Sequence, residues 1–351
     1  MKTRQFKILL LLLMLPGLVM ASDIKKGRYT KEKKIHKAYI VDANAALEIV
    51  NKFGNVYVTT WDENKTDIEI VITVSGNNEE KVNKRLESID VVLEAFKSRI
   101  SAVTKIGGGS FNNVSMEINY TVRIPKKGSL NLNNQYGGIT TGIINGKAQI
   151  HCEYGRINLD QLNNSENTIK MQYSDGGNIN FVNKADIHAE YSGLTVKKAN
   201  SVSLKSAYTN SNFATISDLI FNGEYGDLKA SDLGKLTGRG DYLNINIGTL
   251  RGDFNFSSDY SNITLGNVVN GARNITIDSA YTNVNISTAP DYYYDFEFSL
   301  EYGGLSGGNG LTFTEKKEKD YSSYYKGFYK KSGGNKISVK SEYAGIQLKR
   351  N

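Results

Sequence analysis

Tyrosine side chains recur about every 18 residues through the C-terminal two thirds of the chain. If they lie in register on an outer face, they offer rings on which sugar rings can stack. If they point inward, they form an aromatic ladder inside the core. The spacing is 17–21 residues, followed by a last step of 41 residues. The positions are Tyr136, Tyr154, Tyr173, Tyr191, Tyr208, Tyr225, Tyr242, Tyr260, Tyr281, Tyr302 and Tyr343.

The residues around each tyrosine favour the inward alternative. Ile150, Cys152 and Tyr154 alternate with polar residues, which is the period of a half-buried strand. Most repeats have an apolar residue four positions before the tyrosine and a small residue two positions before it. We therefore expect an internal tyrosine ladder, with the small residue leaving room for the ring. The parity shifts after Gly155, which indicates a bulge or corner at that glycine.

An acidic residue usually lies immediately before the tyrosine, with outward parity. Stacked like charges repel one another, so such a row either binds cations or a basic partner, or stays solvated and opposes aggregation. Glutamine and alanine interrupt the row at Gln135, Gln172, Ala207 and Ala280. The acidic members are Glu153, Glu190, Glu224, Asp241, Asp259, Glu301 and Glu342.

One signature at nearly constant spacing predicts stacked repeats rather than an antiparallel meander. We therefore predict an all-β fold, a single-chain parallel β-solenoid (β-helix-like) of about 18 residues per coil, with each tyrosine above the last. Strand spacing of about 4.8 Å would make ten coils into a rod of roughly 50 Å. Phe53 occupies the tyrosine place in an earlier match to the repeat, so the stack is expected to begin there and then to be interrupted.

The chain is expected to have three parts. Residues 1–21 read as a signal peptide, because a charged start precedes an unbroken apolar run at residues 8–15. We therefore expect export to the periplasm, cell surface or extracellular space, and no transmembrane span. Residues 22–125 are expected to be a β-rich segment with the first coil and a small strand/helix insertion, including a short helix at 78–88. Residues 126–351 form the predicted repeat domain, with an insertion at about 307–337.

That insertion carries mixed aromatic and basic residues, a composition that can bind polysaccharide or nucleic acid. Nucleic acid is a poor target for an exported protein. Without Lys2, Arg4 and Lys7 of the signal peptide, the net charge falls from +7 to +4, which is a small positive charge for a chain of this length. The alternative is a hairpin or loop that covers the end of the stack. The candidate ligand contacts are Tyr321, Tyr324, Tyr325, Lys326, Tyr329 and Lys330.

The sequence predicts no catalytic, cofactor-binding or metal-ligating residues, and so no enzymatic activity. Cys152 is the only cysteine and occupies an inward position, which predicts a buried small residue rather than a reactive thiol. His151 and His188 fall in one outward row but two coils apart. That separation is about 10 Å, too far for both to bind one zinc ion.

The segment from Leu47 to Val56, the Trp61-Asp62 pair and the recurrent Glu-Tyr-Gly-x-Ile/Leu units resemble a bacterial family. It is the β-strand-repeat "putative adhesin" family, a domain of unknown function related to the head-GIN "putative adhesin" domains. The resemblance implies a secreted or cell-envelope β-solenoid and supplies no catalytic residues. This chain departs from the commoner threonine-, serine- and glycine-rich versions by placing tyrosine in nearly every coil.

We therefore expect a non-enzymatic binding scaffold for an envelope polymer, a glycan or a protein. Two other readings stay open. One is a regulatory partner of an envelope-stress system. The other is a polysaccharide-active enzyme on a β-helix, which would need clustered carboxylates in a groove.

Overall fold

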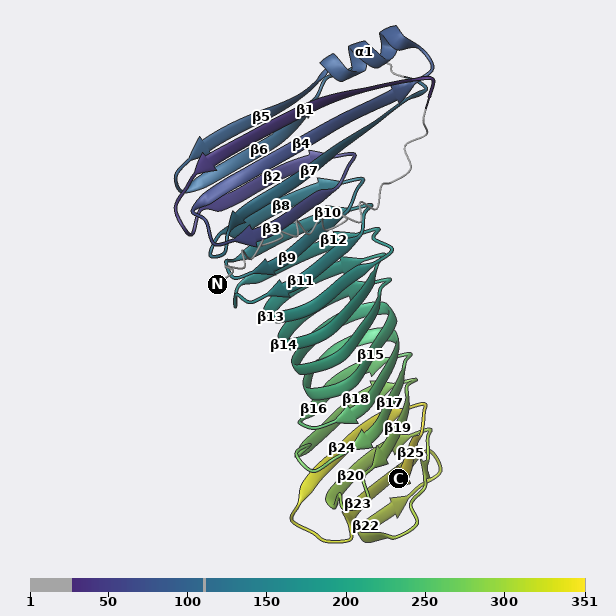
Figure 1. The fold of residues 1–351 in the computed structure, drawn as a ribbon. Coiled ribbons are helices and arrows are strands. Elements are labelled where there is room, and N and C mark those ends of the chain that lie inside the picture. Colours follow the sequence, from purple (N-terminus) through teal and green to yellow (C-terminus); the bar gives the residue numbers. More distant parts are fainter. Residues whose placement is uncertain (1–26, 110–111, 351) are drawn as a thin grey trace, which may run out of the picture.

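The computed structural model describes residues 27–109 and 112–350. It is elongated and all-β apart from one short helix within these residues (Figure 1). The signal peptide predicted at residues 1–21 lies outside the described residues. No helix in the described part of the chain is both long and apolar enough to cross a membrane.

The N-terminal end, where we expected a first coil interrupted by a strand/helix insertion, contains both parallel and antiparallel pairs: β6 and β7 pair in parallel with β2 and β3. Strand β4 pairs antiparallel with β1 and β7, and β5 pairs antiparallel with β6. The predicted short helix is confirmed as α1 (Glu79–Glu87), with the side chain of Asn78 accepting a hydrogen bond from the Lys81 amide at 2.9 Å. The strands are β1 (Tyr29–Ile40), β4 (Lys65–Gly76), β5 (Ile89–Phe96), β6 (Arg99–Ile106) and β7 (Val114–Pro125).

The middle of the chain consists of two parallel ladders, in which each repeat contributes one strand to each ladder. The first ladder holds the strands that end at the tyrosines: β2 (Ala46–Lys52), β8 (Ser129–Gln135), β10 (Ala148–Glu153), β12 (Asn167–Gln172), β16 (Phe254–Asp259) and β18 (Asn274–Ala280). The second holds β3 (Val56–Trp61), β9 (Ile139–Ile144), β11 (Ile157–Leu162), β17 (Asn262–Val268) and β19 (Asn283–Thr288). Three long strands run through both ladders: β13 (Gly177–Glu190), β14 (Gly193–Ala207) and β15 (Asn210–Leu250).

Equivalent residues of successive repeats lie side by side, as the repeat signature predicts. Ile150 pairs with Leu132 on one side and with Ile169 on the other. The aliphatic residues four before and three after the tyrosine, such as Ile150 and Ile157, are buried between the ladders. Cys152 is also fully buried, as predicted. The core is therefore a continuous apolar column between two sheets.

The order of repeats changes at the C-terminal end, where our prediction of strictly sequential stacking is wrong. The last repeat, formed by β24 and β25, lies between the repeat of β18 and β19 and the repeat of β20 and β21. Strand β23 then pairs antiparallel with β20 and with β22, so a hairpin covers the outer edge (Figure 1). These strands are β20 (Tyr294–Glu301), β21 (Leu305–Ser306), β22 (Leu311–Glu318), β23 (Ser322–Tyr329), β24 (Asn335–Glu342) and β25 (Ile346–Arg350).

The glycine after several tyrosines permits a close approach of one repeat's backbone to the next. A Cβ on Gly137 would lie 1.9 Å from the carbonyl oxygen of Gly54, and one on Gly155 would lie 2.0 Å from that of Gly137. Real Cβ atoms do not approach a backbone oxygen so closely. At these corners glycine is therefore required by the spacing of the repeats.

We predict that Gly137→Ala lowers the free energy of unfolding by about 1–3 kcal/mol or more, because the added methyl group forces two repeats apart. Gly142→Ala is the matched control, since the nearest atom to its Cβ would be 3.9 Å away. Chemical denaturation measures both. Equal stability of the two variants would contradict the close packing at this corner.

Candidate functional site

Each tyrosine of the repeat sits at a corner in the left-handed backbone region. Its φ lies between +49° and +60° in all eleven repeats, and Phe53 has a φ of +62°. Our prediction placed the change of parity at the following glycine, but the structure places it at the aromatic residue itself. A positive φ ends the alternation of side chains along the strand. The tyrosine ring therefore does not point to the same face as the aliphatic residue four positions earlier, although the spacing is even.

The rings point outward, so the predicted internal ladder is wrong. Their exposed fractions are 40–54%. The small residue two positions earlier therefore does not make room for the ring. It lies instead beside the backbone of the neighbouring corner: the Ser258 hydroxyl donates to the carbonyl of Gly240 at 2.5 Å, and Cys152 Sγ lies 3.5 Å from the carbonyl of Gly137.

The outward rings form one continuous stack. Neighbouring ring centroids are 4.6–5.2 Å apart and the ring planes differ by 2–13° from Phe53 through to Tyr302. Tyr343 stands between Tyr281 and Tyr302, as the strand order requires. Tyr321 ends the stack at 5.3 Å from Tyr302 with a tilt of 33°.

This stacking decides which ring surface a ligand can reach. Each ring face within the stack is covered by the next ring, so sugar rings cannot stack on these faces. The ring edges and hydroxyls face solvent. Within residues 27–109 and 112–350, the phenol hydroxyls of the repeat tyrosines make no hydrogen bond to protein. The column therefore presents hydroxyl groups at intervals of one strand spacing.

Hydrogen bonds between repeats hold the corners in place. The amide of Tyr154 donates to the carbonyl of Gln172 in the next repeat at 3.1 Å, and the amide of Tyr173 donates to that of Glu190 at 3.1 Å. Four hydroxyls that follow a tyrosine accept a hydrogen bond from the neighbouring repeat: those of Ser192, Thr209, Ser261 and Thr282. The Ser192 amide donates in this way to Thr209 Oγ1 at 3.2 Å.

The residues just before the tyrosines form a column of carboxylates and amides. Gln135 Nε2 donates to Glu153 Oε2 at 2.8 Å, and Gln172 Nε2 donates to Glu190 Oε2 at 2.8 Å. Gln172 lies between Glu153 and Glu190 and separates the two carboxylates, which relieves the repulsion expected of stacked like charges. Gln135 lies between Glu153 and Lys52.

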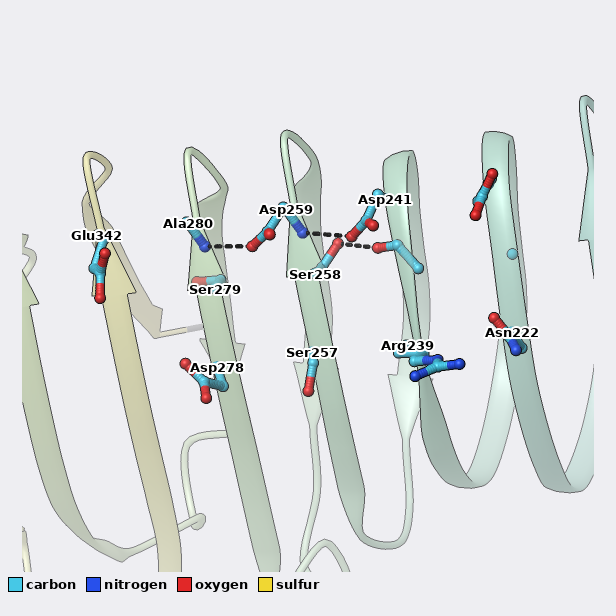
Figure 2. A pocket seen from close by; sticks show the side chains of 13 residues that line it. Asn222, Arg239, Asp241, Ser257, Ser258, Asp259, Asp278, Ser279, Ala280 and Glu342 are labelled. Carbon is cyan, nitrogen blue, oxygen red and sulfur yellow. Dashed lines mark hydrogen bonds between the residues drawn. The ribbon is translucent and has the colours of Figure 1, made fainter.

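A shallow depression of about 430 Å³ lies on this column (Figure 2). Short side chains such as Ala280 border it, together with Arg239 and three aspartates. Asp241 accepts from the Asp259 amide at 2.9 Å, and Asp259 accepts from the Ala280 amide at 3.1 Å. These two carboxylates therefore bridge successive repeats. The third, Asp278, lies three residues before Tyr281, two positions further from the tyrosines than the other two aspartates.

The other side of the tyrosine column carries amide side chains that our sequence analysis missed. Asn262 Nδ2 donates to Asn244 Oδ1 at 3.2 Å, and Asn283 Nδ2 donates to Asn262 Oδ1 at 3.2 Å. These residues lie two positions after a tyrosine, and this fixed offset was the available signal. We call the tyrosine column with the columns one before and two after it the tyrosine face.

The six candidate ligand contacts of the insertion do not gather into one site. Tyr325 is 7% exposed and donates to Glu318 at 2.6 Å, and Tyr324 donates to Glu297 at 3.1 Å. The ring of Tyr329 lies under the guanidinium of Arg350, at 4.5 Å.

The other three candidates lie apart from one another. Lys330 donates to the carbonyl of Pro290, and Lys326 is exposed on β23. Tyr321 is 67% exposed at the end of the ring stack.

The remaining reactive groups form no catalytic arrangement in the described residues. His151 and His188 are each paired in register with Lys170, so they are two repeats apart. No group of three histidine, cysteine or acidic side chains is placed to hold a metal ion in the part of the chain that the structure describes. Burial raises the pKa of the Cys152 thiol to about 12, which keeps it protonated and unreactive at neutral pH.

No family model and no curated protein matches the chain. Similar solved structures include a putative adhesin from Bacteroides fragilis NCTC 9343 (15% identity, TM-score 0.21) and one from Parabacteroides distasonis ATCC 8503 (9%, 0.30), each match covering 91% of this chain and 97% of the other. A putative cell adhesion protein from Clostridium sporogenes ATCC 15579 matches at 11% identity and a TM-score of 0.19, over 91% of this chain and 100% of its own. They are proteins of the kind that the repeat sequence resembles. The whole chains do not superpose at these TM-scores, so no property is carried over from them.

We predict that Tyr191→Ala lowers the free energy of unfolding by about 1–3 kcal/mol, because two ring contacts of about 0.5–1.5 kcal/mol each are lost. Tyr191→Phe keeps the stack and should change stability by less than about 0.5 kcal/mol. Tyr191→Gly should be less harmful than Tyr191→Ala, since glycine adopts a positive φ without strain. Denaturant unfolding of the three variants tests this order, and a loss with phenylalanine equal to that with alanine would contradict it.

Proposed function

We propose that the chain is an exported, non-enzymatic β-solenoid that acts as an adhesin-like scaffold, and that its tyrosine face binds an extended glycan lying along the column. The observation that carries this proposal is the unbroken stack of outward tyrosines, 40–54% exposed and in register from repeat to repeat. The solenoid architecture is supported by the two parallel ladders, in which equivalent residues of successive repeats pair through the middle of the chain.

The chemistry of this face suits a polyhydroxylated ligand. Phenol hydroxyls, asparagine amides and carboxylates together offer both donors and acceptors. Tyrosine and asparagine are also typical of recognition surfaces, because tyrosine gives a large contact area at low entropic cost. Stacking holds the rings in place before binding, so little side-chain freedom is lost when a ligand arrives.

The periodicity favours a linear polymer over a compact ligand. Each repeat offers the same groups at one strand spacing, so a chain of sugars can engage several repeats at once. Weak contacts to one repeat then add up along the column, and affinity is expected to rise with the length of the oligosaccharide.

The charges beside the column narrow the ligand class. Acidic side chains such as Glu153, Glu190 and Asp259 run next to the tyrosines, and they repel phosphate or uronate groups. The ligand expected here is therefore a neutral or amine-bearing glycan. Nucleic acid is disfavoured for the same reason.

We predict that the protein without residues 1–21 binds a neutral glucan or a partly deacetylated amino-sugar polymer but not a polyuronate. Combining Tyr191→Phe, Tyr208→Phe and Tyr225→Phe removes three hydroxyls and keeps the rings. Since each hydrogen bond contributes about 0.5–1.5 kcal/mol, the loss of three should lower affinity by about tenfold to a thousandfold or more. Co-sedimentation with the insoluble polymers and calorimetry with oligosaccharides of increasing length measure this.

The hairpin supplies the matched comparison. Tyr321→Ala with Lys326→Ala alters two of the three exposed insertion candidates without touching the middle of the tyrosine face. Loss of binding in this variant, with full binding by the triple phenylalanine variant, would move the site to the hairpin. Absence of binding to every glycan would contradict the proposal and would favour a protein partner in the envelope.

A further inference from the structure

The last repeat of the chain is inserted between two repeats that precede it in sequence. Strand β24 pairs in parallel with β18 on one side and with β20 on the other, and β25 lies likewise between β19 and β21. Figure 1 shows β24 in yellow between the green β18 and β20. Residues 335–350 thus fill a slot with paired strands on each side, although β21 contributes only two residue pairs.

The register on the two sides of this slot is the same. Ile337 pairs with Ile275 on one side and with Phe296 on the other. The ring of Tyr343 lies 4.6 Å from that of Tyr281 and 4.9 Å from that of Tyr302. The repeat of β20 and β21 could therefore pair directly with that of β18 and β19, without a change of register.

The chain connection is also compatible with direct stacking. Five residues, 269–273, join β17 to β18 across one repeat spacing. Five residues, 289–293, also join β19 to β20, although here the chain passes over the inserted repeat. The two connections make the same turn: the Ala272 amide donates to the carbonyl of Val269 at 3.1 Å, and the Tyr292 amide donates to that of Ala289 at 3.0 Å.

The inserted segment is held by contacts that any second copy of the chain can reproduce. Ile337, Val339, Ile346 and Leu348 are all buried, so a segment that lies outside any slot exposes four aliphatic side chains. The segment joins β23 through residues 330–334, a hinge that contains Gly333 at a φ of +81°. Identical segments from two copies exchange without loss of native contacts when a hinge permits it.

We propose that residues 335–350 exchange between two copies of this chain, each copy placing its last repeat in the slot of the other. A second copy is the occupant that fits, because the slot pairs in register with this segment on both of its sides. Exchange joins two molecules at their C-terminal ends and leaves both tyrosine faces open. A dimer of this kind can engage a polymer at two places, although the exchange itself does not depend on what the tyrosine face binds.

The test uses variants of the full chain that each carry one introduced cysteine. Asn274 and Lys336 are exposed and directly paired, so cysteines there lie within disulfide reach across two neighbouring strands. Asn274→Cys and Lys336→Cys proteins, one of them isotope-labelled, are mixed at high concentration, warmed below the unfolding transition and oxidised. Mass spectrometry of the digest should then find residues 274 and 336 linked between light and heavy chains. The native Cys152 is buried and adds little background.

The control is a pair from the middle of the stack. Asn262 and Asn283 are likewise exposed and paired in register, but neither belongs to the inserted segment. Asn262→Cys mixed with Asn283→Cys should give at least tenfold less cross-chain product. Asn274→Cys with Lys336→Cys in one chain, kept dilute, shows that the bond can form.

Two results would overturn the proposal. One is cross-chain linkage no greater than in the control mixture. The other is unmodified protein that remains a monomer by light scattering at every concentration after the same incubation.

Discussion

The structure depends on the left-handed corner at which each repeat turns around an aromatic side chain. A positive φ costs a residue other than glycine about 1–2 kcal/mol, and the chain accepts it at Phe53 and at eleven tyrosines. Each corner is compensated by ring stacking of about 0.5–1.5 kcal/mol per pair and by amide hydrogen bonds to the next repeat. Because these gains require in-register neighbours, every corner fixes the position of the next.

The same constraint produces the surface to which we assign binding. A left-handed residue cannot follow the inward alternation of its strand, so the ring turns to solvent. Stacking then covers the ring faces and leaves the edges and hydroxyls. The carboxylates and amides beside the column are held by hydrogen bonds between repeats, as with Gln135 and Glu153 or Asn244 and Asn262. Recognition along this face therefore rests on fixed polar groups rather than on flexible loops.

Part of this architecture could be read from the sequence, and the rest could not, for physical reasons. Repeat spacing, the aromatic role of Phe53, the helix after Asn78 and the buried Cys152 follow from local patterns. The outward direction of the rings could not be predicted, because side chains alternate between the two faces of a strand only while the backbone remains extended. The order of the last repeats could not be predicted either. The step from Tyr260 to Tyr281 and the step from Tyr281 to Tyr302 are both 21 residues. Only the strand pairing in the structure reveals that Tyr343 lies between Tyr281 and Tyr302.

The most direct measurement is the nitration of individual tyrosines in the native protein, quantified by mass spectrometry. The structure predicts that Tyr191, Tyr208 and the other repeat tyrosines react, whereas Tyr120 and Tyr292, which are fully buried, react only after unfolding. If the repeat tyrosines were protected from nitration as strongly as Tyr120, their rings would have to lie in the core. That result would contradict both the corner geometry and the proposed binding face.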